Sequence, residues 1–360
     1  MIGFGILIAM LYFRFRRRTG DKVQSDLWID GRGLSLDGLI AGLGGRSEIP
    51  REGTDPLKSD DAGALSFLVR RLGDWKLPTS VGMVPMSELF EIEVREASCL
   101  GSELNSDHVL ILEGDFSRVD GMCSETSLGT TIVFGDVGDR FGGGQRGGSL
   151  VLLGDAGDDA LSGKREGLAL FAGSVGDGFA SPAPGELSGL RGGDSFVFGN
   201  VGGRACERMR RGSVFLCGDV GEYLAHRWIA GTIYVDGCIG RHWCAGMRRG
   251  SLLLRQPQQQ HSGGTLTRRR QCELSFLPIM WKYVRDLLEP WSAFGLHQEL
   301  GECEGSVRLR EAMARFLDRL PNGPRAVRCF GDVECEGQGE VLYFGESVAQ
   351  DVASNEAACI

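Results

Sequence analysis

Carboxylates that recur at a fixed spacing are the residues of this sequence best suited to chemistry. Asp136 and Asp155 lie 19 residues apart, each after a glycine, and Asp219 has the same context further along. Carboxylates held side by side can bind a cation or share a proton. Equivalent positions also hold residues without a carboxylate: Ser174, Asn200 and Cys238. Since Asp and Asn favour turns, we interpret all of these as turn residues.

A Cys/His/Cys set is the second candidate. Cys206 and Cys244 occupy equivalent positions two repeats apart, and His226 falls on the repeat between them. Two repeats of stacked strand separate the thiols by about 9.6 Å, which is too far for a disulfide and poor for a shared metal. Eleven cysteines without a C-x-x-C pair fit a reducing cytoplasm. We therefore expect buried thiols, a surface histidine and no metal.

Two further signals are weak. The Gly142–Gly144 run could cradle a phosphate, but no helix follows it. Glu186 could act as a catalytic acid, but the sequence offers no second group, so we expect a partner contact or a coil cap. Motifs for a P-loop, a nucleophile elbow, HExxH and a zinc ribbon are absent from the sequence. With no converging titratable groups, we expect no catalytic, cofactor or metal residue in this chain.

The repeat that carries these residues has a period of 19. Its units, called coils here, open at a glycine taken as place zero, and one interval of 26 (193 − 167) reveals a seven-residue insertion: Gly129, Gly148, Gly167, Gly193, Gly212, Gly231 and Gly250. Each coil holds one short apolar or β-branched run, which suits a strand and is too short for a helix. Stacked coils of this length predict an all-β core built as a single-stranded parallel β-helix.

Glycines at places six and nine of each coil are expected to form its bends, by positive φ or by close approach. They are Gly135, Gly138, Gly154, Gly157, Gly173, Gly176, Gly199, Gly202, Gly218, Gly221, Gly237 and Gly240.

The strands are apolar on both faces. Places two and four, which must point into the column, are mostly apolar, and place three, which must point outward, is apolar in all seven coils: Ile132, Val151, Leu170, Phe196, Phe215, Tyr234 and Leu253. A strand that is apolar on both faces is buried on both. Either the chain's own C-terminal helices or another subunit must cover this outward stripe.

The rest of the chain divides into flanking regions. We expect an N-terminal extension at 1–21, a cap at 22–107, the β-helix at 108–255, and a C-terminal linker, helices and closing strands at 256–360. Expected elements are a helix before Gly73, strands at 90–94 and 108–112, helices near 278–288 and 309–320, and strands within 327–344. The apolar start, which precedes RFRRR, is too short to span a bilayer. We interpret it as a misassigned start codon, or alternatively a weak membrane anchor, without fold information.

The charge distribution limits the function classes. A net charge of −9 argues against nucleic-acid binding. The pairs Arg210–Arg211 and Arg248–Arg249 stand at equivalent places before an opening glycine, with Arg146 and Arg165 at nearly the same level. Such an arginine row is either a solvated turn edge or a docking strip for an acidic partner.

Several runs resemble a known family. They are the G-x-I-x-V-x-G-x-V/A-G coils, the APGE insertion followed by GLRGG at Gly189–Gly193, RMRRGSVFL at Arg208–Leu216, IAGTIYVDG at Ile229–Gly237, MRRGSLLL at Met247–Leu254 and GDVECEGQGEVL at Gly331–Leu342. The sequence thereby resembles the third subunit of formylmethanofuran dehydrogenase and of the bacterial formyltransferase/hydrolase complex. More distantly it is similar to the C-terminal domain of glutamate synthase, a right-handed β-helix with GXGXG repeats.

The resemblance implies a non-catalytic, cytoplasmic scaffold subunit in one-carbon metabolism. Its partners would be an amidohydrolase-like catalytic subunit that holds the active-site metal, a formyltransferase subunit and the family's second subunit, acting on formylated methanofuran and tetrahydromethanopterin carriers. We expect the outward stripe and the insertion residues Pro184, Gly185 and Glu186 to contact partners. The alternatives are a free-standing glutamate-synthase-like domain that couples amidotransfer partners and a β-helix enzyme that acts on polysaccharide.

Overall fold

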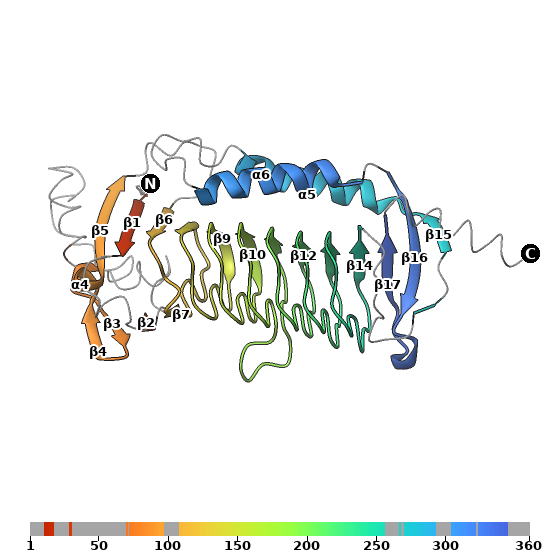
Figure 1. The fold of residues 1–360 in the computed structure, drawn as a ribbon, viewed down its shortest axis with the longest axis horizontal. Helices are drawn as coiled ribbons and strands as arrows, with labels where there is room; N and C mark the ends of the chain where they lie inside the picture. Colours follow the sequence, from red (N-terminus) through yellow and green to blue (C-terminus); the bar gives the residue numbers. More distant parts are fainter. Residues whose placement is uncertain are drawn as a thin grey trace, which may run out of the picture.

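The chain forms an elongated column of stacked strands with two helices along one flank (Figure 1). A computed structural model describes residues 11–17, 29–30, 70, 72–96, 108–255, 266–267, 270–292, 304–321 and 323–344. One sheet of 13 strands runs the length of the column in the order β15-β16-β17-β14-β13-β12-β11-β10-β9-β8-β6-β1-β5. The core is a right-handed parallel β-helix, as the 19-residue period predicts.

Each coil contributes one strand to this sheet, and successive strands pair in parallel and in register. The strands are β6 His108–Glu113, β8 Thr130–Phe134, β9 Arg146–Leu152, β10 Glu166–Phe171, β11 Asp194–Val197, β12 Ser213–Leu216, β13 Thr232–Val235 and β14 Ser251–Leu254. Ile132 pairs with Val151, which pairs with Leu170 in the next coil. A second wall forms from single bridges at place eight, from Val137 to Ala156 and onward to Ile239. Equal repeat lengths therefore stack equal places.

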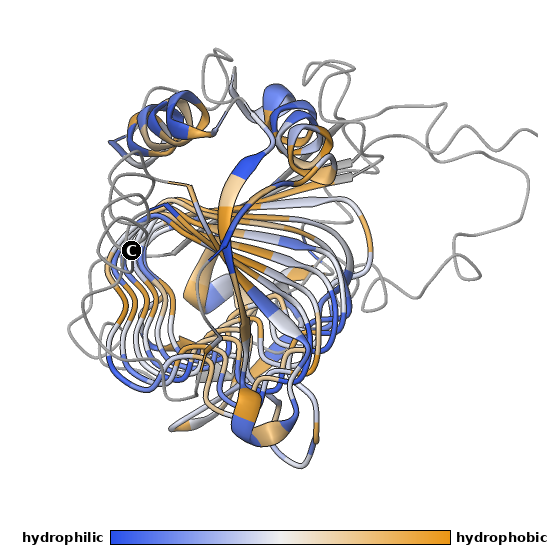
Figure 2. Cartoon of the chain, turned by 90° about the vertical axis from the view of Figure 1, so that its right-hand side faces the viewer, coloured by the Kyte–Doolittle hydropathy of each residue, from blue (hydrophilic) through white to orange (hydrophobic). Residues whose placement is uncertain are grey.

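The interior of the column is a continuous apolar core. Side chains at place four, such as Leu152 and Phe171, are buried there together with the place-eight side chain Val175. Phe171 makes edge-to-face contacts with Phe141 and Phe179 at 5.8 Å, which fills the third wall of the coil. Seen down the column, apolar residues line the inside of the coils (Figure 2).

The N-terminal end is closed by strands that reverse direction. β1 Leu11–Arg17 pairs in parallel with β6 and antiparallel with β5 Phe90–Glu96. The expectation that the first residues carry no fold information was therefore wrong. Phe13 and Phe15 alternate with arginines, a strand pattern that the preceding apolar run concealed. The helix expected before Gly73 lies almost wholly outside the described residues.

A small second sheet and one helical turn complete this end. The sheet has the order β4-β3-β2-β7, formed by β4 Gly82–Pro85, β3 Lys76–Thr79, β2 Ile29–Asp30 and β7 Val119–Asp120. Between β4 and β5, α4 Met86–Leu89 buries Met86 and Leu89 against the first coil. These elements shield the open end of the apolar core.

The C-terminal end is closed in the same manner. β17 Gly339–Tyr343 pairs in parallel with β14 and extends the column by one strand. β16 Arg325–Gly331 and β15 Arg270–Glu273 then add on in antiparallel fashion, and the short 3-10 helix η5 Val333–Cys335 joins β16 to β17. The polar linker expected up to Gln271 thus ends earlier, because Arg270 and Gln271 already pair with β16.

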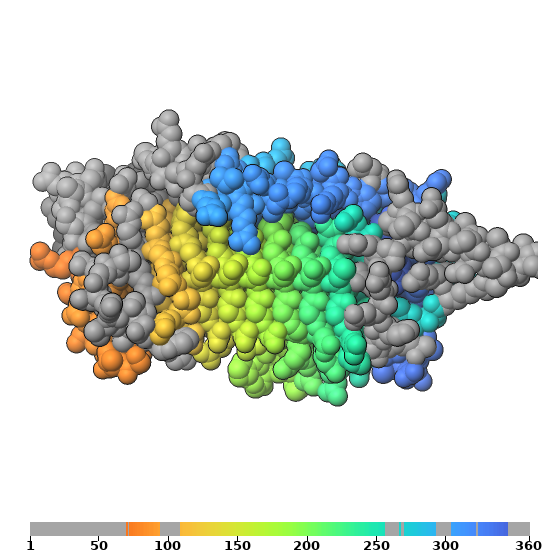
Figure 3. Space-filling view, in the orientation of Figure 1, coloured from red at the N-terminus to blue at the C-terminus, as the bar shows by residue number. Residues whose placement is uncertain are grey.

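Two helices lie along the outer face of the sheet. They are α5 Phe276–Ser292 and α6 Glu304–Arg319, both amphipathic, and they cover one flank of the coils in the space-filling view (Figure 3). Within the described parts of the chain, no helix is long and apolar enough to cross a membrane. The division of the chain at residues 22, 108 and 256 stays a prediction.

Candidate functional site

The carboxylates at place seven form a hydrogen-bonded row along the edge of the coils. Asp136 Oδ1 accepts the backbone N–H of Asp155 at 2.8 Å, and Asp155 Oδ1 accepts that of Ser174 at 2.7 Å. The residues without a carboxylate continue the row: Ser174 Oγ accepts from Asn200, Asn200 Oδ1 from Asp219, and Asp219 Oδ1 from Cys238. Each side chain thus supplies one acceptor to the next coil, as the turn interpretation predicts, and these oxygens do not converge on a cation.

A second row of this kind, three places further along the coil, was not predicted. Asp120 Oδ1 accepts the N–H of Asp139 at 3.1 Å, Asp139 Oδ1 that of Asp158 at 2.9 Å, and Asp158 Oδ1 that of Asp177 at 2.8 Å. Asp177 Oδ1 then accepts the N–H of Gly203 at 2.7 Å. The signal was present in the sequence, because Asp139, Asp158 and Asp177 follow the same 19-residue spacing.

Glycines at places six and nine sit where neighbouring coils approach most closely. A Cβ on Gly218 would lie 2.3 Å from the carbonyl oxygen of Gly199, and a Cβ on Gly154 would lie equally close to the oxygen of Gly135. Among these bend glycines, positive φ occurs at Gly135 alone. Close approach, and not positive φ, is therefore the reason for glycine at these two places.

The Cys/His/Cys set does not converge. Cys206 and Cys244 are free and buried, and burial raises the pKa of both thiols. His226 Nδ1 instead lies 3.7 Å from a carboxylate oxygen of Glu207. In the described part of the chain, no three His, Cys, Asp or Glu side chains are grouped so as to hold a metal ion.

The Gly142–Gly144 run has no amide left for a phosphate. The N–H of Gly142 bonds to the Met122 carbonyl at 2.8 Å, and that of Gly144 bonds to the Ser162 carbonyl at 2.7 Å. The N–H of Gly143 bonds back to Arg140 at 3.1 Å. The run belongs to the inter-coil hydrogen bonding and does not form an anion cradle.

The insertion projects from the edge of the column opposite the helices, between β10 and β11 (Figure 1). Glu186 pairs with Arg165 at 3.6 Å and makes a closer pair with Arg191. Pro184 and Gly185 are exposed, and Leu187 is 80 % exposed. Glu186 therefore neutralises two arginines of neighbouring coils and anchors the loop, which presents its remaining residues to solvent.

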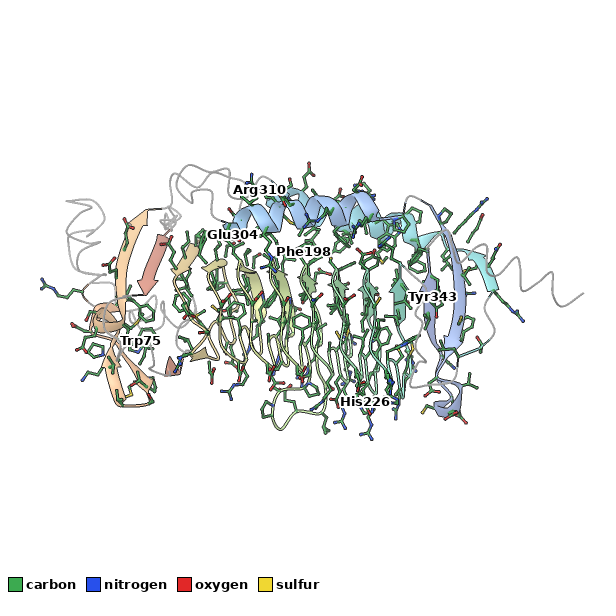
Figure 4. The ribbon with its side chains drawn as sticks, in the orientation of Figure 1. Trp75, Phe198, His226, Glu304, Arg310 and Tyr343 are labelled. Carbon is green, nitrogen blue, oxygen red and sulfur yellow. The ribbon has the colours of Figure 1, made fainter. Side chains whose placement is uncertain are left out.

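The outward stripe is covered by the chain's own helices, the first of the two alternatives. All seven side chains are fully buried and form one cluster with residues of α5 and α6: Ile132, Val151, Leu170, Phe196, Phe215, Tyr234 and Leu253. Phe196 stacks on Phe215 at 4.5 Å, and Phe316 of α6 packs edge-on against both rings at 6.1 Å. Phe198 beside them points toward the helices (Figure 4). These stripe residues are consequently closed to any partner in this arrangement.

Polar contacts hold the helices onto the sheet. Asp236, 3 % exposed, receives Arg319 of α6 at 3.0 Å and makes a closer pair with Arg255 of the next coil. From α5, the hydroxyl of Tyr283 donates to Asp194 Oδ2 at 2.7 Å. Burial and then this hydrogen bond raise the pKa of Tyr283 to about 12. The helices are therefore part of the folded unit.

A lysine inside the column is the main feature that the sequence reasoning missed. Lys164 is fully buried, and its Nζ donates to the Asp194 carbonyl at 2.7 Å and to Ser195 Oγ at 3.0 Å. Burial lowers its pKa to about 7, against the opposing charge of Asp194. A hydroxyl beside a neutral amine is a nucleophile–base pair in chemical terms. Both side chains are fully buried, however, so the pair is a structural one that a substrate does not reach.

Comparisons with known proteins identify the fold. No protein-family model matches the chain, and no curated protein matches it. The chain is similar to a chain of the X-ray crystal structure of the formyltransferase/hydrolase complex from Methylorubrum extorquens, determined in complex with methylofuran. The identity is 24 % and the TM-score 0.64, over 92 % of this chain and 98 % of that chain. The two chains share a fold over nearly their whole lengths.

Proposed function

We propose that this chain is the scaffold subunit, the third of the family's subunits, in a formyltransferase/hydrolase-type complex of one-carbon metabolism. The observation that supports this most is the shared fold, which covers 98 % of a chain from such a complex and includes the regions outside the coils. The family runs in the sequence, among them the APGE insertion and the MRRGSLLL coil, agree with it.

A non-catalytic role is supported by how the reactive side chains are used. The place-seven carboxylates bond to backbone amides, Glu186 bonds to two arginines, and Lys164 is sealed inside the column. Catalysis needs converging groups beside a space for substrate. We therefore assign the chemistry, and the active-site metal, to an amidohydrolase-like partner, with a formyltransferase subunit and the family's second subunit completing the complex in the cytoplasm.

The contact surfaces follow from what the column leaves exposed. Since the outward stripe is buried, the flank offers the outer face of α5 instead, where Phe276 is 39 %, Ile279 71 % and Tyr283 48 % exposed. These positions share one helical face. Opposite, the insertion offers Pro184 and Leu187. We propose that partner subunits pack on these two surfaces and pass the formyl group between tetrahydromethanopterin and a methanofuran-type carrier such as the methylofuran bound in the related complex.

The experiment is affinity purification of the tagged chain from its source cell, followed by assays of formyl transfer and formate release. We expect amidohydrolase-like and formyltransferase subunits to co-purify, and activity to require them. A chain that purifies alone at native abundance, or one that releases formate alone, would refute the scaffold role. Recovery of a large glutamate-synthase-like enzyme would favour the amidotransfer alternative, and a molybdenum or tungsten subunit would indicate a dehydrogenase complex.

A further inference from the structure

Positive charge gathers on the turns of the last full coils. The segments 203–211, 222–230 and 241–249 together carry eight arginines and two glutamates, a local charge of 8 − 2 = +6 in a chain of net charge −9. We name these arginines the basic edge: Arg204, Arg208, Arg210, Arg211, Arg227, Arg241, Arg248 and Arg249. His226, which lies among them, marks this edge at the side of the column opposite the helices (Figure 4).

Backbone hydrogen bonds hold the three segments in register. The N–H of Arg204 bonds to the Glu222 carbonyl at 2.7 Å, and that of Tyr223 bonds to the Arg241 carbonyl at 2.9 Å. Arg227 bonds in the same way to Ala245 at 2.7 Å. Equivalent side chains therefore stand about 4.8 Å apart, and the basic edge spans about 10 Å along the column.

Arginines in the earlier coils have carboxylate partners, whereas most of the basic edge has none. Arg146 pairs with Glu125 at 2.8 Å, and Glu186 serves both Arg165 and Arg191. In the basic edge, Glu207 pairs with Arg204 and Arg208. Among the described residues, no ion pair forms at six exposed guanidinium groups: Arg210, Arg211, Arg227, Arg241, Arg248 and Arg249. Like charges this close are unfavourable unless an outside group neutralises them.

An exposed aromatic pair lies within the same edge. Tyr223 stacks on His242 with ring centroids 4.9 Å apart and planes inclined by 20°, and Tyr223 is 41 % exposed. Tyrosine and arginine are the residue types enriched at the centres of protein interfaces. The basic edge therefore combines charge with a rigid apolar platform.

We propose that the basic edge is a docking site for an acidic segment of a partner protein, whose carboxylates pair with the guanidinium groups while an apolar side chain rests on the Tyr223–His242 stack. The size and borders of the edge favour a protein segment over a nucleic acid. Toward the N-terminus it meets coil turns that carry Asp139, Asp158 and Asp159, and toward the C-terminus it meets the turn with Glu334 and Glu336. A long polyanion laid along the column would meet these carboxylates, whereas a short acidic segment ends before them.

The first test measures binding of a fluorescein-labelled 12-residue peptide of alternating glutamate and serine by fluorescence anisotropy. We expect salt-dependent binding by the wild-type chain and an affinity loss of about tenfold or more for Arg211→Glu/Arg249→Glu. The control Arg315→Glu/Arg325→Glu makes the same change in net charge on exposed arginines elsewhere, and should change affinity less than about twofold. Arg211→Lys/Arg249→Lys should retain binding, which separates charge from folding defects.

The inference deepens the proposed scaffold role, and a second arm separates their failures. Equal peptide binding by the two Glu double variants, or tighter binding of a 12-nucleotide single strand than of the peptide, would overturn the docking site. In affinity purification from the source cell, Arg211→Glu/Arg249→Glu should lose a subunit that the wild-type chain and the control variant retain. If all three chains retain every subunit, the docking site is wrong and the scaffold role stands; if the wild-type chain recovers none while peptide binding behaves as expected, the scaffold role fails and the docking site stands.

Discussion

The buried Lys164 makes the stability of the fold depend on pH in a direction opposite to that of a paired surface lysine. Burial lowers the pKa of Lys164 from 10.5 to about 7 in the folded chain, whereas an unfolded chain restores the ordinary value. Between these two values the unfolded chain binds a proton that the folded chain does not. The free energy of unfolding therefore rises with pH by about 1.4 kcal/mol for each pH unit, up to a total of about 4 to 5 kcal/mol, and the full cost of the charge is present below pH 7.

Lys164→Met tests this dependence because it keeps the length of the side chain and removes the titrating amine. Urea unfolding, followed by tryptophan fluorescence at pH 7, 8, 9 and 10, gives the free energy of unfolding of each protein. The wild-type chain should gain about 4 kcal/mol on the variant between pH 7 and pH 10, since all other titrating groups are common to both. Lys76→Met, at an exposed lysine of β3, is the matched control and should run parallel to the wild-type chain.

Parallel pH profiles for the wild-type chain and Lys164→Met would refute the reasoning. They would mean that the amine stays charged inside the column, with its hydrogen bonds to Ser195 Oγ and the Asp194 carbonyl compensating the burial.

Three further predictions concern stability, each measured by thermal and urea unfolding. Asp155→Ala should cost about 1 kcal/mol, because it removes the acceptor for the Ser174 N–H, while Asp155→Asn should be nearly neutral; equal losses would point to a need for the charge itself, as in cation binding. Gly218→Ala should cost more than about 2 kcal/mol, because its Cβ would lie 2.3 Å from a carbonyl oxygen of the preceding coil, whereas Gly323→Ala has open space; similar melting temperatures for both would contradict the close approach. Arg255→Leu should cost about 2 to 3 kcal/mol by weakening the pairing of the buried Asp236, and Asp236→Asn in the same chain should restore part of it; additive losses would argue against a coupled pair.

The coils and helices could be predicted because both repeat with a period that a single sequence reveals. Glycines every 19 residues mark the coils, and Leu309, Met313 and Phe316 mark the buried face of α6. The strand β1 was missed because its pairing with β5 and β6 joins residues about 80 to 100 positions apart, which no local pattern encodes. Long-range pairing of this kind depends on the assembled fold.

The site was harder to predict, since its contacts depend on neighbours in space. Lys164 stands at place 16 of its coil, where the other coils carry buried side chains such as Gln145, Met209 and Trp228. Comparison of that place across the coils would have indicated a buried lysine. By contrast, the pairing of Glu186 with two arginines depends on the path of the insertion, which the sequence does not specify.

The antiparallel strands at the two ends give the protein a defined length. A stack of identical parallel strands offers its last member as a template for another molecule, and such templates lead to filaments. Here β5 and β15 reverse direction, and both outermost strands carry charged residues, as in FEIEVRE and RQCE. Further molecules therefore find no matching surface at either end. The protein consequently acts as a ruler of set size, and whatever binds at two places along it is kept at a constant separation.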